Sequence, residues 1–354
     1  MITYFLQNFA QLMYKFLIRP VLFLFPAETV HHFVITALQV AGKIPGLLAM
    51  VRNFYTVRDA TLVRKVAGIT FPNPVGLAAG FDKDAIAFEE LSSMGFGFIE
   101  IGTVTPLAQP GNPKPRLFRL PADEALINRM GFNNEGAREA AMRLRSVKHN
   151  VIIGGNIGKN KATANADATL DYLVCLRQLF DVVDYFVVNI SSPNTPGLRE
   201  LQDKGPLIEL LKSVQNENRQ KPNPKPVFLK IAPDLTETQV DDIIEITLKT
   251  QLAGLIISNT TIDRENLKTT ASELEEIGAG GVSGRPVFEK SNALLRYVVF
   301  KSNKQFAIIA SGGIFSANDA LEKLRLGADL VQLYTGFIYE GPALVKRINK
   351  KLVG

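Results

Sequence analysis

The sequence contains one cysteine, three histidines and no tryptophan among its 354 residues. The single thiol, Cys175, excludes an internal disulfide framework and a cysteine-rich metal site. His31, His32 and His149 lack the spacing of metal ligands, so we expect no metal site. These shortages favour a reducing location that faces the cytosol.

The chain also lacks a strong charge of either sign. Its net charge is +6, and the basic residues are scattered rather than clustered. No nucleic-acid-binding module is present, so we expect no nucleic-acid partner. The mild positive charge favours phosphates, carboxylates or acidic lipid headgroups.

The first sixty residues contain ten of the thirty aromatic residues, and they lack a long uncharged stretch. Lys15, Arg19 and Pro26 interrupt the apolar sequence before it reaches the roughly 18–20 residues of a membrane-spanning helix. We therefore expect two or three short helices, with breaks near residues 20–26 and 42–45, that lie on a membrane surface. A helical cap packed on the rest of the chain is the alternative, and the two arrangements are compatible.

From residue 66 on, one unit recurs: a β-branched apolar run, a small or polar residue, and a helix-like segment. The eight runs are Pro74–Ala79, Phe96–Gly102, Val151–Ile157, Tyr185–Ile190, Val227–Ile231, Gly254–Ser258, Phe306–Ala310 and Leu330–Tyr334. The clearest amphipathic segments are 167–180, 236–250, 317–326 and 342–352.

Continuous apolar runs are typical of strands that are buried on both faces of a parallel sheet. Eight such units predict an α/β protein with a (β/α)8 TIM barrel over residues 61–354, preceded by a helical extension over residues 1–60. A doubly wound open sheet is the alternative.

The predicted strands end in asparagine, serine, threonine and lysine, at the rim where the chemistry of such barrels gathers. This rim has no carboxylate pair and no Ser–His–Asp set. It suits hydrogen bonding to a planar, amide-rich ligand, with lysines for negative charge. Glycine-rich turns at 311–314 and 334–336 expose backbone N–H groups that could hold a phosphate, although each could also be a plain turn.

Ten motifs follow one another along this predicted barrel. They are GLAAGFDKD (76–84), EIGTVTP (100–106), KPRLFRL (114–120), INRMGFNN (127–134), NIGKN (156–160), NISSPNTPGLR (189–199), KIAPDL (230–235), SNTT (258–261), GGVSGRP (280–286) and SGGI (311–314). In this order they resemble the motifs of dihydroorotate dehydrogenases. The resemblance implies a bound FMN and the oxidation of (S)-dihydroorotate to orotate in pyrimidine biosynthesis.

Ser192 indicates the class within that family. The soluble class uses a cysteine as its catalytic base, whereas here Ser192 lies at the corresponding place and Cys175 lies in a distant predicted helix. Serine together with the apolar extension resembles the membrane-associated, quinone-dependent class 2. The resemblance implies that Ser192 takes the C5 proton of dihydroorotate while a hydride leaves C6 for the flavin, and that a membrane quinone then receives the electrons. We expect a monomer bound peripherally to the cytoplasmic face of the cell membrane through residues 1–60.

The resemblance also implies the residues of three sites. The FMN site would comprise Ala79, Gly80, Phe81, Asp82, Lys83, Thr103, Asn156, Asn189, Lys230, Ser258, Gly284, Gly313, Tyr334 and Thr335. The substrate site would comprise Lys83, Asn128, Arg129, Met130, Gly131, Phe132, Asn189, Asn194, Asn259 and Thr260. His31 and Arg119 would line a quinone tunnel beside the extension.

Plainer alternatives remain for several of these assignments. Lys230 could be a solvated lysine at a strand end, His31 a structural histidine, and Gly197–Gly205 an ordinary loop rather than a mobile lid. Three rival functions are a soluble dihydroorotate dehydrogenase that uses fumarate or a nicotinamide, a Schiff-base aldolase with Lys230 as nucleophile, and a non-enzymatic ligand binder at the membrane.

Overall fold

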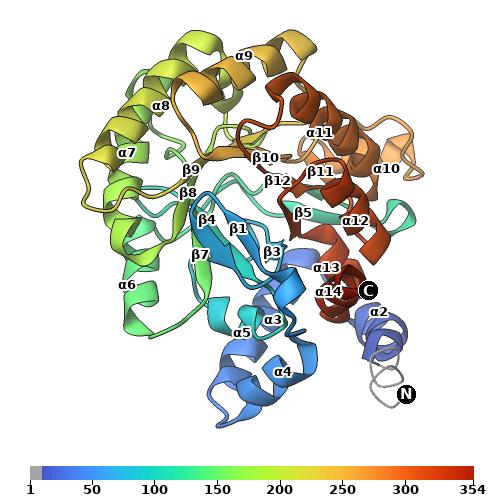
Figure 1. Ribbon diagram of the computed structural model, residues 1–354. Coiled ribbons are helices and arrows are strands. Elements are labelled where there is room, and N and C mark those ends of the chain that lie inside the picture. The colour runs from blue at the N-terminus through green and yellow to red at the C-terminus, as the bar shows by residue number, and fades with distance from the viewer. Residues whose placement is uncertain (1–9) are drawn as a thin grey trace.

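Eight parallel strands close into a barrel in the computed structural model, which describes residues 10–354 (Figure 1). In chain order they are β3 (Val75–Leu77), β4 (Phe98–Val104), β7 (Ile152–Ile157), β8 (Tyr185–Asn189), β9 (Val227–Ile231), β10 (Gly254–Ile257), β12 (Ala307–Ser311) and β13 (Leu330–Leu333). Pairing of β13 with β3 closes the ring. The barrel prediction is therefore confirmed, and the open-sheet alternative is wrong.

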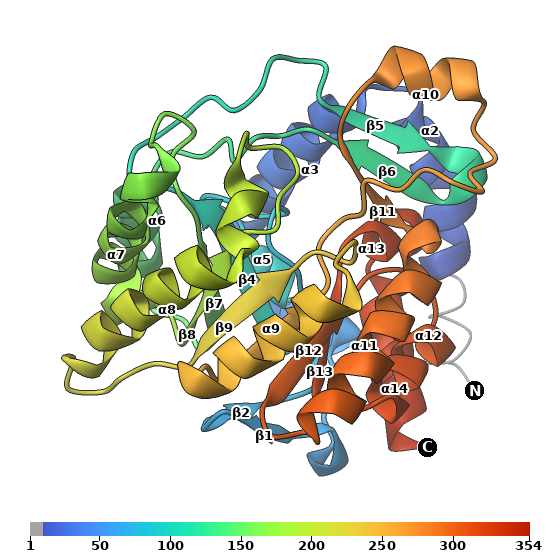
Figure 2. The same ribbon diagram turned by 90° about the horizontal axis from the view of Figure 1, so that it is seen from above.

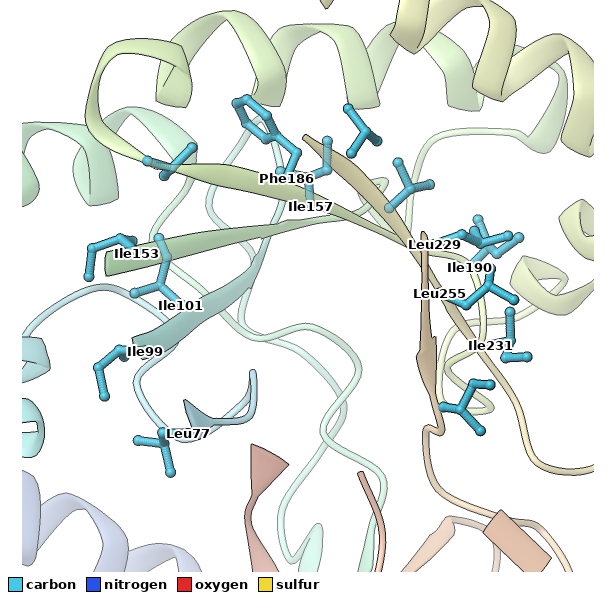
Figure 3. Packing of buried hydrophobic residues seen from close by; sticks show 14 of the residues in the cluster. Leu77, Ile99, Ile101, Ile153, Ile157, Phe186, Ile190, Leu229, Ile231 and Leu255 are labelled. Atoms are coloured by element: carbon cyan, nitrogen blue, oxygen red, sulfur yellow. The ribbon is translucent and has the colours of Figure 1, made fainter. Parts of the chain in front are cut away.

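Helices surround the barrel and cover its outer face. They are α5 (Phe88–Ser92), α6 (Ala137–Ser146), α7 (Ala168–Leu179), α8 (Lys204–Arg219), α9 (Glu237–Lys249), α11 (Phe288–Ser302), α12 (Ala317–Arg325) and α14 (Ala343–Val353). Apolar side chains such as Ile99, Phe186 and Leu229 leave the strands toward these helices (Figure 3). Local sequence sets some helix starts: Thr236 and Ser316 form capping boxes at α9 and α12, which satisfy backbone N–H groups of the first turn.

Aromatic and aliphatic side chains fill the amino-terminal half of the barrel interior. The buried residues of this cluster are Val66, Phe71, Phe98, Tyr185, Val187, Phe228, Ile256, Ile309 and Leu330. Val66 and Phe71 come from a hairpin of β1 (Arg64–Val66) and β2 (Ile69–Phe71). Gly76 makes room for the Phe98 ring, because a Cβ atom on Gly76 would lie 2.2 Å from it. This end of the barrel is therefore a packed core, as in other barrels of this type.

A second, three-stranded antiparallel sheet lies outside the barrel, and the sequence did not predict it. It consists of β5 (Leu117–Leu120), β6 (Ala125–Asn128) and β11 (Gly281–Gly284) in the order β11-β6-β5. β5 and β6 come from the long connection after β4, and β11 comes from the connection after β10, which also contains α10 (Ala271–Ile277) (Figure 2). Connections after barrel strands lie at the functional rim, so this sheet belongs to the site end of the molecule.

The N-terminal helices follow the predicted breaks. A turn of π-helix (Tyr14–Ile18) leads into α2 (Arg19–Phe23), and α3 (Ala27–Gly42) and α4 (Leu47–Tyr55) follow after Pro26 and after residues 43–46. Residues 1–9 of the predicted extension lie outside the described residues. None of the helices described from residue 10 on is long and apolar enough by itself to cross a bilayer; α3 and α4 pass that test only as a pair, which is bent by 112°.

One face of these helices packs on the barrel. Glu28 forms an ion pair of 2.8 Å with Arg116, and Tyr14 donates a hydrogen bond of 2.5 Å to the carbonyl of Ile338. The opposite face carries exposed apolar side chains, including Leu24 at 80% and Phe16 at 70% exposure. The helices thus form a cap on the barrel and also present an apolar surface to the outside.

Candidate active site

A cavity of about 1020 Å³, open to solvent, lies at the carboxyl ends of the barrel strands. Its lining comes from the strand ends, from the loop that contains Ser192, and from Asn128, Ser283 and Gly284 of the second sheet. The carboxyl ends of the strands form the functional rim of such barrels. The cavity therefore brings together segments that are more than 200 residues apart in the sequence.

A ring of polar side chains lies directly above the apolar interior. Side chains two residues apart on a strand point to the same face, and on most barrel strands a polar residue follows an apolar interior residue at this spacing. The ring comprises Glu100, Asn156, Asn189, Lys230, Ser258, Ser311 and Gln332, and all of these are buried. On most strands the barrel interior thus changes from apolar to polar between one inward-facing residue and the next.

Hydrogen bonds between side chains of different strands fix the orientation of these groups. Glu100 accepts bonds from Asn156 Nδ2 at 2.8 Å and from Gln332 Nε2 at 2.5 Å. Thr103 donates to Asn156 Oδ1 at 2.5 Å and accepts from Asn189 Nδ2 at 2.8 Å. A network in which the buried amides are held in place presents a fixed set of donors and acceptors to a ligand.

Lys230 is the cation of this ring. Its side chain is only 6% exposed, so the alternative of a solvated strand-end lysine is wrong. Burial lowers the pKa of Lys230, and the charge of Glu100 opposes this shift. No side chain or carbonyl in the described part of the chain accepts a hydrogen bond from its ammonium, although Lys230 lines the cavity. A buried ammonium without such an acceptor favours a ligand that carries negative charge or acceptor atoms.

The predicted substrate residues gather on one side of the cavity. Lys83, Asn128, Met130, Gly131, Phe132, Asn189, Asn194, Asn259 and Thr260 all line it. Asn194 Nδ2 donates to Asn128 Oδ1 at 2.9 Å, and Lys83 donates to Asn133 Oδ1 at 2.9 Å. Burial, together with the charge of Arg116, lowers the pKa of Lys83 to about 8. Lys83 is thus a half-buried cation beside several amide side chains.

Ser192 lines the same cavity from the loop between β8 and the 3₁₀ helix Leu198–Gln202. It is 6% exposed, and its Oγ accepts a hydrogen bond of 3.3 Å from the Asn194 backbone N–H. Cys175 lies in α7 against the carbonyls of Val104 and Gly158, and burial raises its thiol pKa well above the usual value. It does not line the cavity, so Ser192 rather than the thiol has access to a ligand.

Backbone turns form another part of the cavity lining. Gly312 (φ +108°) and Gly313 (φ +72°) follow β12 in left-handed conformations that favour glycine. A Cβ atom on Gly313 would lie 2.4 Å from the Cβ of Phe288, so a side chain there would clash. Ala79, Gly80, Thr103, Ser258, Gly284, Tyr334 and Thr335 complete the predicted FMN residues that line the cavity.

Four of the residues predicted for the FMN and substrate sites do not reach the cavity lining. The Asp82 carboxylate accepts hydrogen bonds from the backbone N–H groups of Ile86 (2.8 Å) and Ala87 (2.9 Å), and it fixes the turn after β3. Arg129 donates to the carbonyls of Ile277, Ala279 and Pro115, away from the cavity. Phe81 packs against Tyr334 and Phe337, and Asn156 lies beneath the lining.

His31 and Arg119 have different surroundings. Burial and the charge of Lys83 lower the pKa of His31 to about 4, and its ring lies 5.2 Å from the Phe81 ring. Arg119 donates to the carbonyl of Phe25 at 2.6 Å, and its guanidinium lies 4.4 Å from the centre of the Phe23 ring. Each side chain joins an N-terminal helix segment to the barrel or its second sheet.

Several lining residues were missed in the sequence, including Ser283 and Gln332. Gln332 could have been found by counting two residues from Leu330 along its strand. Ser283 could not, because it reaches the cavity through the unpredicted second sheet. Residues 10–354 contain no group of three or more histidine, cysteine or acidic side chains that could hold a metal ion.

Comparisons with known proteins agree with this geometry. A sequence model of the dihydroorotate dehydrogenase family matches residues 61–354. A protein of Christiangramia forsetii named dihydroorotate dehydrogenase (quinone) is 59% identical over 96% of this chain and 99% of its own. One of Synechococcus sp. (strain JA-3-3Ab) with the same name is 48% identical over 96% of this chain and 92% of its own.

The fold comparison leads to the same family. The crystal structure of a dihydroorotate dehydrogenase of Eimeria tenella in complex with ferulenol is similar, with a TM-score of 0.83 and 39% sequence identity. The match covers 92% of this chain and 90% of that one. The ligand-free form of the Eimeria enzyme gives a TM-score of 0.82.

Proposed function

The chain belongs to the dihydroorotate dehydrogenase family, and we propose that it oxidises dihydroorotate to orotate. FMN would be its flavin and a membrane quinone its electron acceptor. The relatives that match nearly the whole chain are named as the quinone-dependent enzyme. The observation that carries the proposal is the cavity that Ser192, Lys83 and Lys230 line together.

The cavity fits a flavin in two respects. Lys230, a buried cation, lines it, and the turn of Gly312 and Gly313 brings backbone groups to its wall. Backbone N–H groups in such a turn are suited to hold a phosphate. We assign the flavin to the side of the cavity formed by Ala79, Gly80, Thr103, Asn189, Lys230, Ser258, Gly284, Gly313, Tyr334 and Thr335. When bound, FMN supplies the two-electron acceptor that no side chain in the cavity provides.

Lys230 would stabilise negative charge on the flavin side of the cavity, because an ammonium interacts strongly at short range in a buried site. Asn189 and Thr103, held by their mutual hydrogen bond of 2.8 Å, would present polar groups whose orientation is fixed in advance. Asn156 supports this pair from below. Phe81 and Asp82 would act through the shape of the turn rather than through direct contact.

The amide wall would bind the substrate. Dihydroorotate has ring N–H and C=O groups, which match the side chains of Asn128, Asn194 and Asn259. Lys83 supplies a positive charge for the carboxylate. Met130, Gly131, Phe132 and Thr260 complete this part of the lining.

Ser192 would take the proton from C5 of the substrate. A hydroxyl is a weak base in water, so the reaction requires a desolvated site and a route for the proton. Ser192 is 6% exposed, and the nearby Thr195 is 3% exposed with a hydroxyl oxygen that no described group hydrogen-bonds. Thr195 therefore provides an unused acceptor for a proton relay.

The N-terminal helices would bring the quinone to the barrel. Their apolar outer side chains are Leu12, Phe16, Leu17, Ile18, Val21, Leu24, Phe25, Phe33, Val40, Ile44 and Met50, all exposed. A surface of this kind suits peripheral attachment to a bilayer. Attachment to the cytoplasmic face, a monomeric state and quinone contacts from His31 and Arg119 belong to the same proposal.

The absorption spectrum of the purified protein tests this proposal. We expect a yellow protein with flavin bands that bleach when dihydroorotate is added without air and return when a quinone is added. A colourless protein that is trapped by borohydride with a keto substrate would favour the aldolase chemistry of Lys230. A yellow protein that dihydroorotate does not bleach would refute the assigned substrate.

A further inference from the structure

Arg199 ties together three loops at the edge of the cavity without lining it. It lies in the 3₁₀ helix Leu198–Gln202, directly after the Ser192 loop. Its Nε donates to the carbonyl of Ser191 at 3.1 Å, Nη1 donates to Asp234 Oδ2 at 3.2 Å, and Nη2 donates to the carbonyl of Thr260 at 3.4 Å. The Ser191 carbonyl belongs to the peptide that leads into Ser192.

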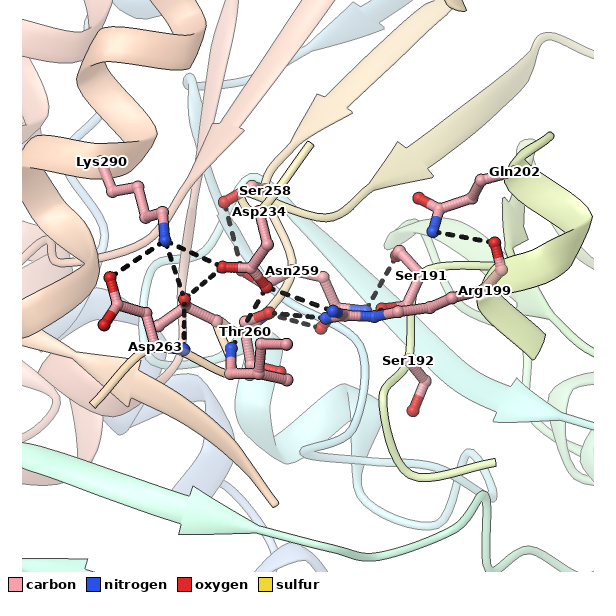
Figure 4. Close-up of polar contacts among 12 residues, drawn as sticks. Ser191, Ser192, Arg199, Gln202, Asp234, Ser258, Asn259, Thr260, Asp263 and Lys290 are labelled. Carbon is pink, nitrogen blue, oxygen red and sulfur yellow. Dashed lines mark hydrogen bonds and ion pairs between the residues drawn. The ribbon is translucent and has the colours of Figure 1, made fainter. Parts of the chain in front are cut away.

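Asp234, on the loop after β9, is the centre of this network (Figure 4). Its Oδ2 also accepts a bond of 3.1 Å from the Ile262 backbone N–H, and its Oδ1 accepts from the Thr261 hydroxyl and from Lys290 Nζ at 3.0 Å. Four donors from three segments thus converge on one carboxylate that is 13% exposed. Such a carboxylate holds its partners in one geometry, because two of the donors are charged and a third is a backbone N–H group.

Lys290 anchors the network to the outside of the barrel. It lies in the first turn of α11 and also forms an ion pair of 3.2 Å with Asp263. Thr261, Asp263 and Lys290 line a separate surface cleft and not the active-site cavity. The network therefore runs from the peptide before Ser192 to a helix of the barrel wall.

The same short peptide is held from its other side as well. Asn259 Nδ2 donates to Ser191 Oγ at 2.9 Å, so residue 191 is bound through both its side chain and its carbonyl. The side chain of Ser192 itself points away from this network (Figure 4). Its Oγ is thus left to the cavity, while the backbone that carries it is fixed.

We propose that Arg199 and Asp234 form a latch that positions Ser192 for proton abstraction, with Lys290 as its outer anchor. Arg199 is a positioning residue: it touches neither the cavity nor a ligand, and it acts through the peptide between Ser191 and Ser192. The proposal rests on the proposed role of Ser192. It also assigns a function to the loop Gly197–Gly205, whose beginning carries the latch.

Arg199→Lys is the sharpest test, because lysine keeps the charge but cannot make three directed bonds at once. The two half-reactions are measured separately by stopped flow on the flavin-loaded, full-length protein. We expect flavin reduction by saturating dihydroorotate to slow by on the order of tenfold to hundredfold, since small misplacements of a reacting group have effects of this size. Flavin content and reoxidation by quinone are expected to stay unchanged. An equal loss in both half-reactions, or no loss, would overturn the latch.

A double-mutant cycle separates a latch from two independent structural contacts. Asp234→Asn should slow reduction in the same way, and the variant with both changes should be little worse than the poorer single variant. Fully additive losses would show that the two residues do not act together. If Arg199→Lys does not fold, Lys290→Met provides the measurement, because it removes one of the four donors to Asp234 and should cause a smaller, selective loss.

The chain offers a control ion pair, one partner of which lies on the same helix as Lys290. Lys301, near the end of α11, and Asp241 of α9 form an exposed ion pair of 3.1 Å that shares no partner with the latch. Lys301→Met and Asp241→Asn are expected to leave both half-reactions unchanged. Ser192→Ala distinguishes the two proposals. If this variant reduces the flavin at the normal rate, the proposed role of Ser192 is wrong. If Ser192→Ala reduces the flavin slowly but Arg199→Lys reduces it at the normal rate, only the latch is refuted.

Discussion

The barrel and the N-terminal helices distribute their polar and apolar side chains in opposite ways. The barrel buries charged and amide groups such as Glu100, Asn189 and Lys230 at its mouth. The helices expose apolar groups such as Phe16, Leu24 and Phe33. Each arrangement is unfavourable without a partner, since buried charges need compensation and exposed apolar surface is poorly solvated. The difference agrees with the proposed polar ligand at the barrel mouth and with the proposed membrane contact of the helices.

Replacing Ser192 by alanine should have the largest effect, and it should affect only the half-reaction that takes place in the barrel. Flavin reduction by dihydroorotate is expected to fall by about 10²–10⁴-fold, the usual contribution of a general base. Reoxidation by quinone should not change, because the helices are untouched. Stopped-flow measurement of both steps tests this, with Ser213→Ala on the exposed side of α8 as a control. Normal reduction would remove Ser192 from the reaction.

Deleting residues 1–60 should produce the opposite pattern. The truncated protein is expected to lose reduction of a long-chain quinone and recovery with membranes, but to retain much of its reduction by dihydroorotate. A water-soluble electron acceptor serves as the control for an intact barrel. If a long-chain quinone is still reduced normally, the helices do not form the quinone site.

Glu28→Gln tests how firmly the two regions are joined. Glu28 of α3 and Arg116 of the barrel connection form an ion pair whose side chains are 11% and 6% exposed. Removing one partner of a buried pair should lower the free energy of unfolding by about 3 kcal/mol. Glu209→Gln, at an exposed pair with Lys212, should change it by less than about 0.5 kcal/mol. Equal urea denaturation midpoints for both variants would show that the Glu28 pair contributes little.

The pH dependence of substrate capture gives the smallest expected effect. Burial lowers the pKa of Lys83 to about 8, so the ammonium is charged below that pH and loses its proton above it. kcat/KM for dihydroorotate should therefore decrease above pH 8, by up to about tenfold per pH unit. The quinone step, measured alone, should lack this decrease. A constant kcat/KM between pH 7 and 9 would show that the charge of Lys83 is not needed.

The barrel could be predicted because each strand is an apolar run followed by a polar end, which is a local pattern. The helix breaks near Pro26 and residues 43–46 could be predicted for the same reason. The second sheet could not, because its strands are only four residues long and β11 pairs with β6 across about 150 residues of sequence.

The direction in which a side chain points was the second feature that the sequence could not predict. Asp82 and Lys83 are adjacent in one motif, and both were predicted to contact a ligand. Of these two side chains only Lys83 reaches the cavity, whereas Asp82 accepts hydrogen bonds from the backbone of the turn. The hydrogen-bond network of Arg199 could not be predicted from the sequence for a related reason. Its three partners come from three connections, and only the closed barrel brings them together.

The burial of Cys175 has a practical consequence. The thiol is 0% exposed, and burial raises its pKa. It can therefore react with alkylating reagents only when the barrel opens around α7. Because the chain has no other cysteine, the rate of thiol labelling would measure how often the structure opens around Cys175. The protein thus contains its own probe of conformational opening, and the enzyme should keep its activity in the presence of such reagents as long as it stays folded.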